Sequence, residues 1–457
     1  MIRAILACDA NWGIGKSGTL PWPHNSDDLK WFKENTTGST VVMGKSTWDS
    51  LPVKPLPNRK HIVVTSSTER LPDGVEKLSS DIMRSRLTTI KEDLWIIGGA
   101  KLIEGLLPII DEFHLSQIAD TYDCDTFLPV TLIQELFTLT SSIVSSFRSK
   151  YISLPLSYQI FGKSTDTAPI VLVNHALTGN STITGKNGWW KNIIGENKLI
   201  DTNKYSIIAF NIPGNGIDNY LIKSYTDFTA RDIAAIFKIG LDILKIDKLH
   251  TVIGGSIGGG IAWELAALYP ELIENLIPIA TDWKATDWLL ANTKVQELIL
   301  NNSSNPVHDA RVHAMNLYRT PESYNSKFNR CVDHNSNTSK VENWLLHHGK
   351  KLQERYQLTS YKLVNHLLST IDITRDRGDF LEVASLIKSN IFIIGIDSDL
   401  FFSAKENKDT FLALSKAKSN VHYGEIKSIH GHDAFLIEFE QLETLLQNIF
   451  TTQPQTA

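Results

Sequence analysis

Cysteine is scarce in this chain of 457 residues, and its three thiols, Cys8, Cys124 and Cys331, lie far apart. Three isolated thiols exclude the disulfide framework of a small secreted domain, and their spacing does not fit a metal-binding cluster. Long apolar runs are also lacking, because no segment approaches the ~18–20 residues that a membrane-spanning helix needs. The N-terminus turns polar at Asp9, without the basic and apolar regions of an export signal. These absences predict a cytoplasmic protein with reduced cysteines and no metal.

A large excess of one charge is absent as well. The chain has 45 basic and 50 acidic residues, a net charge of −5, so it offers no broad basic field for nucleic acid or an anionic membrane. Apolar residues make up 42% and charged residues 21%, which is ordinary for a globular protein. We therefore expect small molecules as partners, bound by about two or three folded domains.

Two series of apolar runs divide the chain. The first series covers 2–8, 39–44, 60–66, 94–99 and 112–118. Short helical patterns lie between its runs, at 27–36 and 100–107. This alternation predicts an α/β domain with a central sheet and flanking helices. The second series is more continuously apolar, as in buried parallel strands, and covers 170–176, 205–211, 250–256, 275–281, 390–396 and 420–426.

The second series is interrupted by about a hundred residues with helical spacing, which predict an all-helical cap over about 284–388. We place the first domain at 1–148 and the second at 149–457. The segment LSYQIFG at 156–162 fits the last strand of the first domain or an opening strand of the second, and we favour the second.

A carboxylate and two aromatic residues share one face of the helix predicted at 27–36. Asp28, Trp31 and Phe32 have i, i+3, i+4 spacing, and a carboxylate against an apolar wall can relay a proton near neutral pH. Alternatively, Asn25 is the N-cap and Asp28, at N3, complements the helix dipole. Spacing alone favours this second interpretation.

Two strand-to-helix turns carry glycine, at Gly44-Lys45-Ser46-Thr47 and at Ile97-Gly98-Gly99-Ala100-Lys101. Backbone N–H groups at such turns can bind phosphate, although each turn alone is a weak signal. The first 145 residues nevertheless resemble dihydrofolate reductase as a set, through GIGKSGTLPW, DDLKWFK, VVMGKSTWDSL, LPNRKHIVVTS, WIIGGAKLIEGLL and DTFLP in the family's order.

The resemblance implies a central mixed sheet, with a pterin site and an NADPH site. Asp28 would bind the pterin and assist protonation of N5, Arg59 would pair with the glutamyl carboxylate, and Trp22 would orient a water. Ser116 stands where the family commonly has a threonine bonded to the acid, and Ile103 replaces a frequent tyrosine. The remaining implied residues are Ile5, Leu29, Phe32 and Leu56 for the pterin wall, Ala7, Ile14, Gly15 and Leu20 for the nicotinamide side, and Lys45, Thr65, Ser66 and Lys101, with the two glycine turns, for the rest of NADPH.

The second series contains a nucleophile-elbow pattern. Gly254-Gly255-Ser256-Ile257-Gly258 fits G-x-S-x-G between a strand and a helical pattern, where Ser256 would be exposed on a sharp turn and the Ile257 N–H would stabilise an oxyanion. A serine nucleophile needs an imidazole base, and the imidazole needs a carboxylate. Asp397 or Asp399 and His430 or His432 follow in the right order, and position alone does not choose within either pair.

Residues from about 150 to 450 resemble the homoserine O-acetyltransferases of the α/β-hydrolase fold. The matching segments are NHALTGNS, GWWKNIIGENKLIDTNKYSIIAFN, VIGGSIGGG, ARVHAMNLYRT, GIDSDLFF and HGHDAFLIEFEQL. The resemblance implies Ser256 as nucleophile, Asp399 as orienting acid and His432 as base. Leu177 would give the second oxyanion N–H, while Arg311 and Asp433 would hold homoserine. It also implies acetyl-CoA as co-substrate and a homodimer formed through the hydrolase domain.

The sequence also departs from this second family. The Gly/Ser/Pro-rich stretch expected after FNIPGNG is missing, and the cap is short around 285–310. The expected function is a bifunctional enzyme of methionine biosynthesis that reduces dihydrofolate with NADPH and acetylates homoserine by a ping-pong mechanism. Alternatives are an esterase or another donor or acceptor in the second half, a non-catalytic half, and an artificial join of two proteins.

Overall fold

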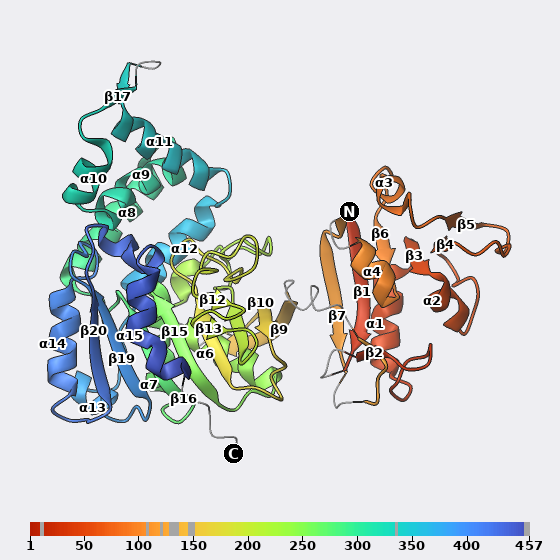
Figure 1. The fold of residues 1–457 in the computed structure, drawn as a ribbon, viewed down its shortest axis with the longest axis horizontal. Helices are drawn as coiled ribbons and strands as arrows, with labels where there is room; N and C mark the ends of the chain where they lie inside the picture. Colours follow the sequence, from red (N-terminus) through yellow and green to blue (C-terminus); the bar gives the residue numbers. More distant parts are fainter. Residues whose placement is uncertain are drawn as a thin grey trace. The chain divides into compact units, whose positions relative to one another are not determined.

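The computed structural model of the chain describes residues 1–9, 13–106, 109–118, 122–127, 137–144, 151–333 and 337–451. These residues form two compact units, Met1–Phe137 and Thr138–Ala457. The first unit contains a six-stranded sheet and the second an eight-stranded sheet (Figure 1). The predicted boundary between residues 148 and 149 lies outside the described residues.

The first unit is the predicted α/β domain with flanking helices. Its sheet has the order β5-β4-β3-β6-β1-β7, and the described strand pairs are all parallel. Alternation along β1 places Ala4 and Leu6 in one buried cluster and Ile5 in the other, so both faces of the sheet are covered. The main elements are β1 (Ile2–Cys8), α1 (Ser26–Thr36), β3 (Thr40–Gly44), α2 (Lys45–Ser50), β4 (Lys60–Val64), β5 (Val75–Leu78), α3 (Met83–Leu87), β6 (Leu94–Ile96), α4 (Ala100–Leu106) and β7 (Glu112–Gln117).

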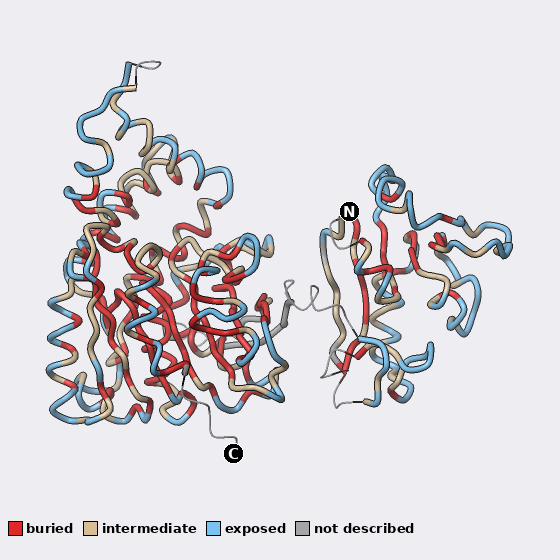
Figure 2. Tube along the Cα trace, in the orientation of Figure 1, coloured by how far each residue is buried: buried red, intermediate tan, exposed pale blue. Residues whose placement is uncertain are grey.

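The second unit contains the second predicted sheet, with the order β20-β19-β16-β15-β11-β14-β10-β9. Strand β10 (Tyr151–Gly162) runs antiparallel to β14, so LSYQIFG lies in this sheet, as the sequence favoured. Strands at the centre of the sheet are buried while the outer helices expose one side (Figure 2). The other elements are β9 (Phe137–Val144), β11 (Ile170–Asn174), β14 (Ser206–Phe210), α6 (Ala230–Ile243), β15 (Leu249–Gly255), α7 (Ile257–Leu268), β16 (Ile273–Ile279), β19 (Asn390–Ile396), α14 (Ala404–Leu414), β20 (Val421–Ile426) and α15 (Phe439–Thr451).

The cap predicted at 284–388 is mainly helical and stands above the strands of the second unit (Figure 1). A short hairpin, β17 (Val332–Asp333) with β18 (Thr338–Ser339), interrupts it, so the all-helical prediction was incomplete. The cap helices are α8 (Asp287–Asn302), α9 (Pro306–Tyr318), α10 (Pro321–Phe328), α11 (Lys340–Gln353), α12 (Leu358–Ser369) and α13 (Phe380–Ala384). None of the helices among the described residues combines the length and the apolar character required to cross a membrane.

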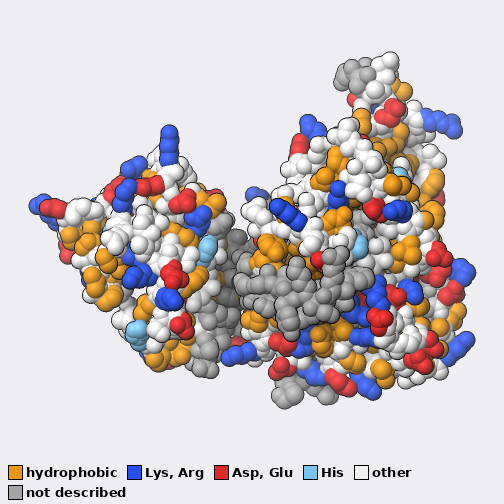
Figure 3. Space-filling view, turned by 180° about the vertical axis from the view of Figure 1, so that it is seen from behind, with side chains coloured by type: hydrophobic (Ala, Val, Ile, Leu, Met, Phe, Trp, Pro, Cys, Tyr) orange, Lys and Arg blue, Asp and Glu red, His pale blue; other side chains and the backbone are white. Residues whose placement is uncertain are grey.

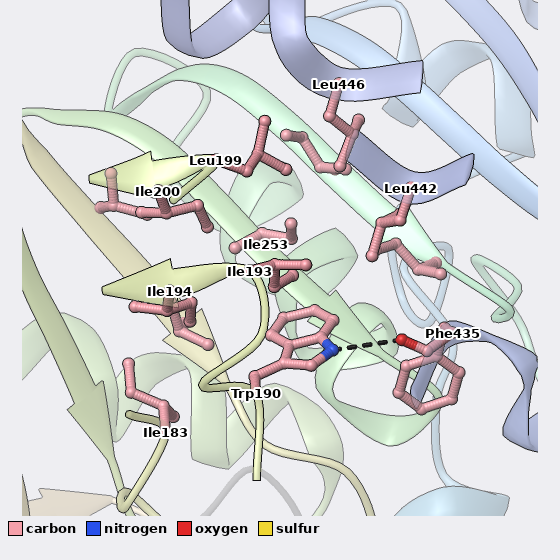
Figure 4. Close-up of a cluster of buried hydrophobic side chains, with 14 of the residues drawn as sticks. Ile183, Trp190, Ile193, Ile194, Leu199, Ile200, Ile253, Phe435, Leu442 and Leu446 are labelled. Carbon is pink, nitrogen blue, oxygen red and sulfur yellow. Dashed lines mark hydrogen bonds between the residues drawn. The ribbon is translucent and has the colours of Figure 1, made fainter. Parts of the chain in front are cut away.

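Trp190 anchors the core of the second unit. Its side chain is completely buried, and the indole Nε1 donates a hydrogen bond to the Phe435 carbonyl at 3.1 Å (Figure 4). Leu442 and Leu446 of α15 lie in the same cluster. This core therefore fixes the segment that follows His432. On the outside, acidic and basic side chains are interspersed over the face shown in Figure 3.

Candidate active sites

Ser256 lies on a strained turn between β15 and α7, as predicted. Its backbone has φ 58° and ψ −130°, a conformation that residues other than glycine rarely adopt. A Cβ atom at Gly254 would lie 2.5 Å from the Gly258 carbonyl carbon, and one at Gly258 would lie 2.6 Å from the Asn174 carbonyl oxygen. Both glycines are therefore required for the backbone to close around the serine.

The structure brings Asp399 and His432 together. His432 Nδ1 lies 2.7 Å from Asp399 Oδ2, while Asp399 Oδ1 accepts hydrogen bonds from the Phe401 and Phe402 N–H groups at 2.7 and 2.9 Å. The Asp399 side chain is completely buried. Three donors thus hold the carboxylate, which in turn orients the imidazole. Asp397 instead accepts from the Ser428 N–H at 3.0 Å.

Phe435 connects the histidine segment to the nucleophile elbow. The ring centroids of His432 and Phe435 are 5.7 Å apart, and a Cβ atom at Gly255 would lie 2.5 Å from Phe435 Cε2. Ser256 and His432 are both buried. Tyr318 of the cap also packs on His432, with a centroid distance of 5.6 Å. The elbow, the histidine and the cap therefore meet at one place.

The loop that carries Leu177 is fixed by the cap and by a buried histidine. Tyr356 donates its hydroxyl proton to the Leu177 carbonyl at 3.2 Å, and Arg355 donates to the Thr178 carbonyl at 3.1 Å. His175 Nε2 accepts from the Ile212 N–H at 3.0 Å, and its Nδ1 lies 2.8 Å from the Ala176 carbonyl. Burial lowers the pKa of His175 to about 4, so the ring is neutral near pH 7.

The start of α7 is bonded to the same loop, since Asn174 Nδ2 donates to the Gly258 carbonyl at 3.1 Å. The segments of Leu177 and Ile257, the two predicted oxyanion donors, are therefore neighbours. The roles of Asn174, His175, Arg355 and Tyr356 were not identified from the sequence, where only the NHALTG match pointed to the first two.

Two predicted substrate residues in the second unit have cap partners. The Arg311 guanidinium lies 5.4 Å from the Tyr318 ring centroid. Asp433 Oδ2 accepts from Arg319 Nε at 2.9 Å, and Arg319 also contacts His430 Nδ1 at 3.3 Å. Asp433 is therefore ion-paired before any ligand binds. Sequence reasoning missed Arg319, because nothing local shows that it contacts a residue 114 positions away.

In the first unit, β1, α1 and the residue before β4 bring together Ile5, Phe32 and Arg59 of the predicted pterin residues. The Asn25 side chain accepts from the Asp27 and Asp28 N–H groups, each at 3.1 Å, so Asp28 has the predicted N3 position and is half-buried. Phe32 packs on the cluster that contains Ile5, and the Arg59 guanidinium lies 5.8 Å from the Phe32 ring centroid. The two interpretations of Asp28 are thus compatible.

Other predicted residues of the first unit differ in exposure. Trp22 is buried and packs on Tyr122 with a centroid distance of 6.0 Å, whereas Leu20 and Leu29 are exposed. Ala7 and Ser116 are register partners on β1 and β7. Ile14 packs on the core, and Gly15 belongs to β2 (Gly13–Gly15). Leu56 and Thr65 are half-buried, whereas Ser66 and Lys101 are exposed. Ile103 is completely buried in α4.

The two glycine turns lie side by side at one end of the first sheet. The Gly44 N–H donates to the Gly98 carbonyl at 2.9 Å, and a Cβ atom at Gly98 would lie 3.1 Å from Thr47 Oγ1. Lys45 at the start of α2 pairs with Asp49 and Glu69, at 2.7 and 2.9 Å. A phosphate bound here would compete with two carboxylates for this lysine. Among the described residues, no group of histidine, cysteine and acidic side chains could hold a metal ion.

Comparisons with known proteins agree with this division. Residues 1–159 match the dihydrofolate reductase family, and residues 169–411 match the alpha/beta hydrolase fold family. The first match extends over β9 and most of β10, which the structure places in the second unit. Homoserine O-acetyltransferase of Cyclobacterium marinum is 30% identical over 350 residues, covering 71% of this chain and 97% of that protein.

Solved structures resemble the second unit in fold. A homoserine O-acetyltransferase from Bacillus anthracis has a TM-score of 0.62 at 20% identity, covering 71% of this chain and 100% of its own. An acetylester hydrolase from Corynebacterium glutamicum has a TM-score of 0.59 at 19% identity, covering 71% and 98%. The fold is therefore shared by transferases and esterases. The chain belongs to the homoserine O-acetyltransferase family, with the alpha/beta hydrolase fold, and carries a dihydrofolate reductase domain ahead of it.

Proposed function

We propose that the chain is a bifunctional enzyme, which reduces 7,8-dihydrofolate to tetrahydrofolate with NADPH and transfers acetyl from acetyl-CoA to the hydroxyl of L-homoserine. The observation that carries the second activity is the 2.7 Å Asp399–His432 bond beside the strained Ser256 turn. Reduced folate supplies the methyl group of methionine, and acetylhomoserine supplies its carbon skeleton. Both products would thus serve methionine biosynthesis.

Transfer proceeds in two steps through Ser256. In the first step, Ser256 Oγ attacks the thioester carbonyl, His432 Nε2 takes the serine proton, and that proton leaves on the CoA thiol. In the second step, the homoserine hydroxyl gives its proton to His432 and attacks the acetyl-enzyme, after which the proton returns to Ser256. Asp399 holds the imidazole and stabilises its cation. The Leu177 and Ile257 N–H groups stabilise the oxyanion in each step.

Arg311 is suited to hold the carboxylate of homoserine, because a guanidinium binds a carboxylate with two hydrogen bonds. Asp433 is proposed to contact the polar end of the same substrate while Arg319 fixes one of its oxygens. The ion pair limits the rotation of the Asp433 side chain. This arrangement favours an amino acid over a simple alcohol as acceptor.

In the first unit, Asp28 is proposed to bind the pterin ring and assist proton transfer to N5, and Arg59 to pair with the glutamyl carboxylate. The adjacent glycine turns fit a dinucleotide, because a Cβ atom at Gly98 would meet Thr47 and glycine keeps this backbone accessible. Lys45 and Lys101 would hold the 2′-phosphate. When bound, NADPH supplies the hydride.

A second candidate for the second unit is an esterase, with water as the acceptor. The observation that favours it is the similar fold likeness to an acetylester hydrolase, with a TM-score of 0.59. The same serine, histidine and aspartate would serve both reactions, because only the second nucleophile differs.

Thiol release from acetyl-CoA, measured with and without homoserine, separates the two candidates. Transfer predicts release that requires homoserine and is lost in Ser256→Ala. Slow release that depends on Ser256 but is indifferent to homoserine would instead support the esterase.

A further inference from the structure

A buried carboxyl that the proposed mechanism does not use lies near the catalytic aspartate. Asp282 follows β16 and is only 5% exposed. Among the described residues, the charged groups that act on it are Glu406 of α14 and Asp399, and both are acidic. Lys284, two positions further along the chain, pairs with Asp372 at 3.2 Å. A charged carboxylate at Asp282 would therefore be repelled by its neighbours without a compensating cation.

Asn407 joins Asp282 to the first turn of α14. Its Nδ2 donates to Asp282 Oδ1 at 2.7 Å and to the Thr281 carbonyl at 2.8 Å. The Thr281 carbonyl can only accept, so the amide nitrogen must be on that side, and both amide protons are used. Asn407 is itself buried. These two bonds attach the start of α14 to the segment that leaves β16.

Each of the two bonded side chains has a second oxygen without a partner. Across the part of the chain that the structure describes, neither Asp282 Oδ2 nor Asn407 Oδ1 has a hydrogen bond, although both atoms are buried. Native proteins seldom leave buried polar atoms unpaired. Two acceptors cannot bond to each other, whereas a protonated carboxyl is also a donor. A proton on Asp282 can therefore pair these two oxygens and complete an acid–amide pair with two hydrogen bonds.

The electrostatic surroundings favour this proton. Burial and the charges of Glu406 and Asp399 raise the pKa of Asp282 to about 8, although the Asn407 bond acts in the opposite direction. The carboxyl therefore keeps its proton near pH 7. His432 then faces the negative charge of Asp399 without a second carboxylate charge from Asp282.

The start of α14 directly follows the loop that holds the catalytic aspartate. Phe401 and Phe402 in this loop donate their N–H groups to Asp399 Oδ1. The rings of the same two residues pack on His432, with centroid distances of 5.3 and 5.5 Å. A shift of the first turn of α14 would therefore move the donors to the acid and the wall of the base together.

We propose that Asp282 is a protonated positioning residue, which shares its proton with Asn407 Oδ1 and thereby holds the loop that orients Asp399 and His432. Its effect on the rate rests on the proposed acyl transfer through Ser256, whereas its protonation does not. Asp282 takes no part in the proton transfers of the reaction.

Urea unfolding of the full chain between about pH 5 and pH 7 tests the proton. Asp282→Asn is the matched variant, because a second amide can make the same two bonds without titrating. The folded chain keeps a proton that the unfolded chain, with the ordinary pKa of 3.8, releases. The unfolding equilibrium constant should therefore rise by about tenfold per pH unit relative to that of Asp282→Asn. Asp397→Asn leaves Asp282 intact and should keep this rise, and equal pH dependence in the unsubstituted chain and Asp282→Asn would overturn the proposal.

The positioning effect is measured as the rate at which 4-nitrophenyl acetate acylates Ser256, with Ser256→Ala as the background. Asp282→Leu should slow acylation by roughly tenfold or more, because the loop is no longer held, and Asp282→Asn should restore the rate. An unchanged rate in Asp282→Leu, or an equal loss in Asp282→Asn, would overturn the positioning role. The unfolding measurement decides on the proton even where Asp282→Leu does not fold. Acylation without homoserine-dependent thiol release from acetyl-CoA would count against the transferase function alone.

Discussion

Asp399 is the residue whose contacts most constrain the chemistry. Its carboxylate binds His432 Nδ1 at 2.7 Å and two backbone N–H groups. Asp399→Asn should lower Ser256-dependent acetyl transfer by about a thousandfold or more, because an amide can hold the imidazole in the wrong tautomer. Transfer rates would be compared with those of Asp397→Asn, which lacks this contact. Similar losses in both variants would contradict the assignment.

The buried residue His175 should make the folding stability depend on pH. Burial lowers its pKa from 6.5 to about 4, so the unfolded chain binds more protons than the folded chain between these values. The stability that His175 contributes is therefore complete above pH 6.5 and is lost as the pH falls toward 4. Urea unfolding across this range should show a shallower pH dependence in His175→Asn. An unchanged slope would show that His175 is not the titrating group.

At the scale of elements, the packing of the elbow against the segment after His432 is decisive. Gly255→Ala would bring a Cβ atom within 2.5 Å of Phe435 Cε2. Overpacking of this kind costs typically ~1–3 kcal/mol, and here it also displaces the histidine segment. We expect a lower unfolding free energy and at least tenfold slower transfer. Combining Gly255→Ala with Phe435→Leu should recover part of the unfolding free energy and part of the transfer rate. If neither recovers, the clash lies elsewhere.

The sequence predicted most elements, because their apolar runs are local. The strand predicted at 390–396 matches β19. The helix predicted at 27–36 begins one residue after the observed start of α1 at Ser26. The cap contacts could not be predicted in the same way. Arg355 and Tyr356 reach the oxyanion loop across 177 and 179 positions, and only tertiary packing creates these bonds. Position likewise did not choose between Asp397 and Asp399, whereas the backbone bonds around Asp399 separate them.

At the scale of the whole molecule, the division between the two units can be tested with fragments. A fragment that begins at Thr138 keeps β10 and all of β9 except Phe137, and we expect it to fold. A fragment that begins at Lys163 loses five buried apolar side chains of β10, which are Leu154, Leu156, Tyr158, Ile160 and Phe161. Their burial stabilises the fold by on the order of 7–15 kcal/mol, comparable to a domain's total stability. Folding of each fragment would be measured by circular dichroism melting. A cooperative melting transition in the fragment that begins at Lys163 would contradict this boundary.

The proposed bifunctional enzyme carries two active sites in one chain, and two paired assays on single preparations can separate them. Dihydrofolate reduction by NADPH and acetylhomoserine formation would be measured for the unsubstituted chain, Asp28→Asn and Ser256→Ala, with Asp27→Asn as the matched control. We expect Asp28→Asn to lose only reduction, Ser256→Ala to lose only transfer, and Asp27→Asn to keep both. Acetylhomoserine formation that survives Ser256→Ala, or reduction that survives Asp28→Asn, would contradict it.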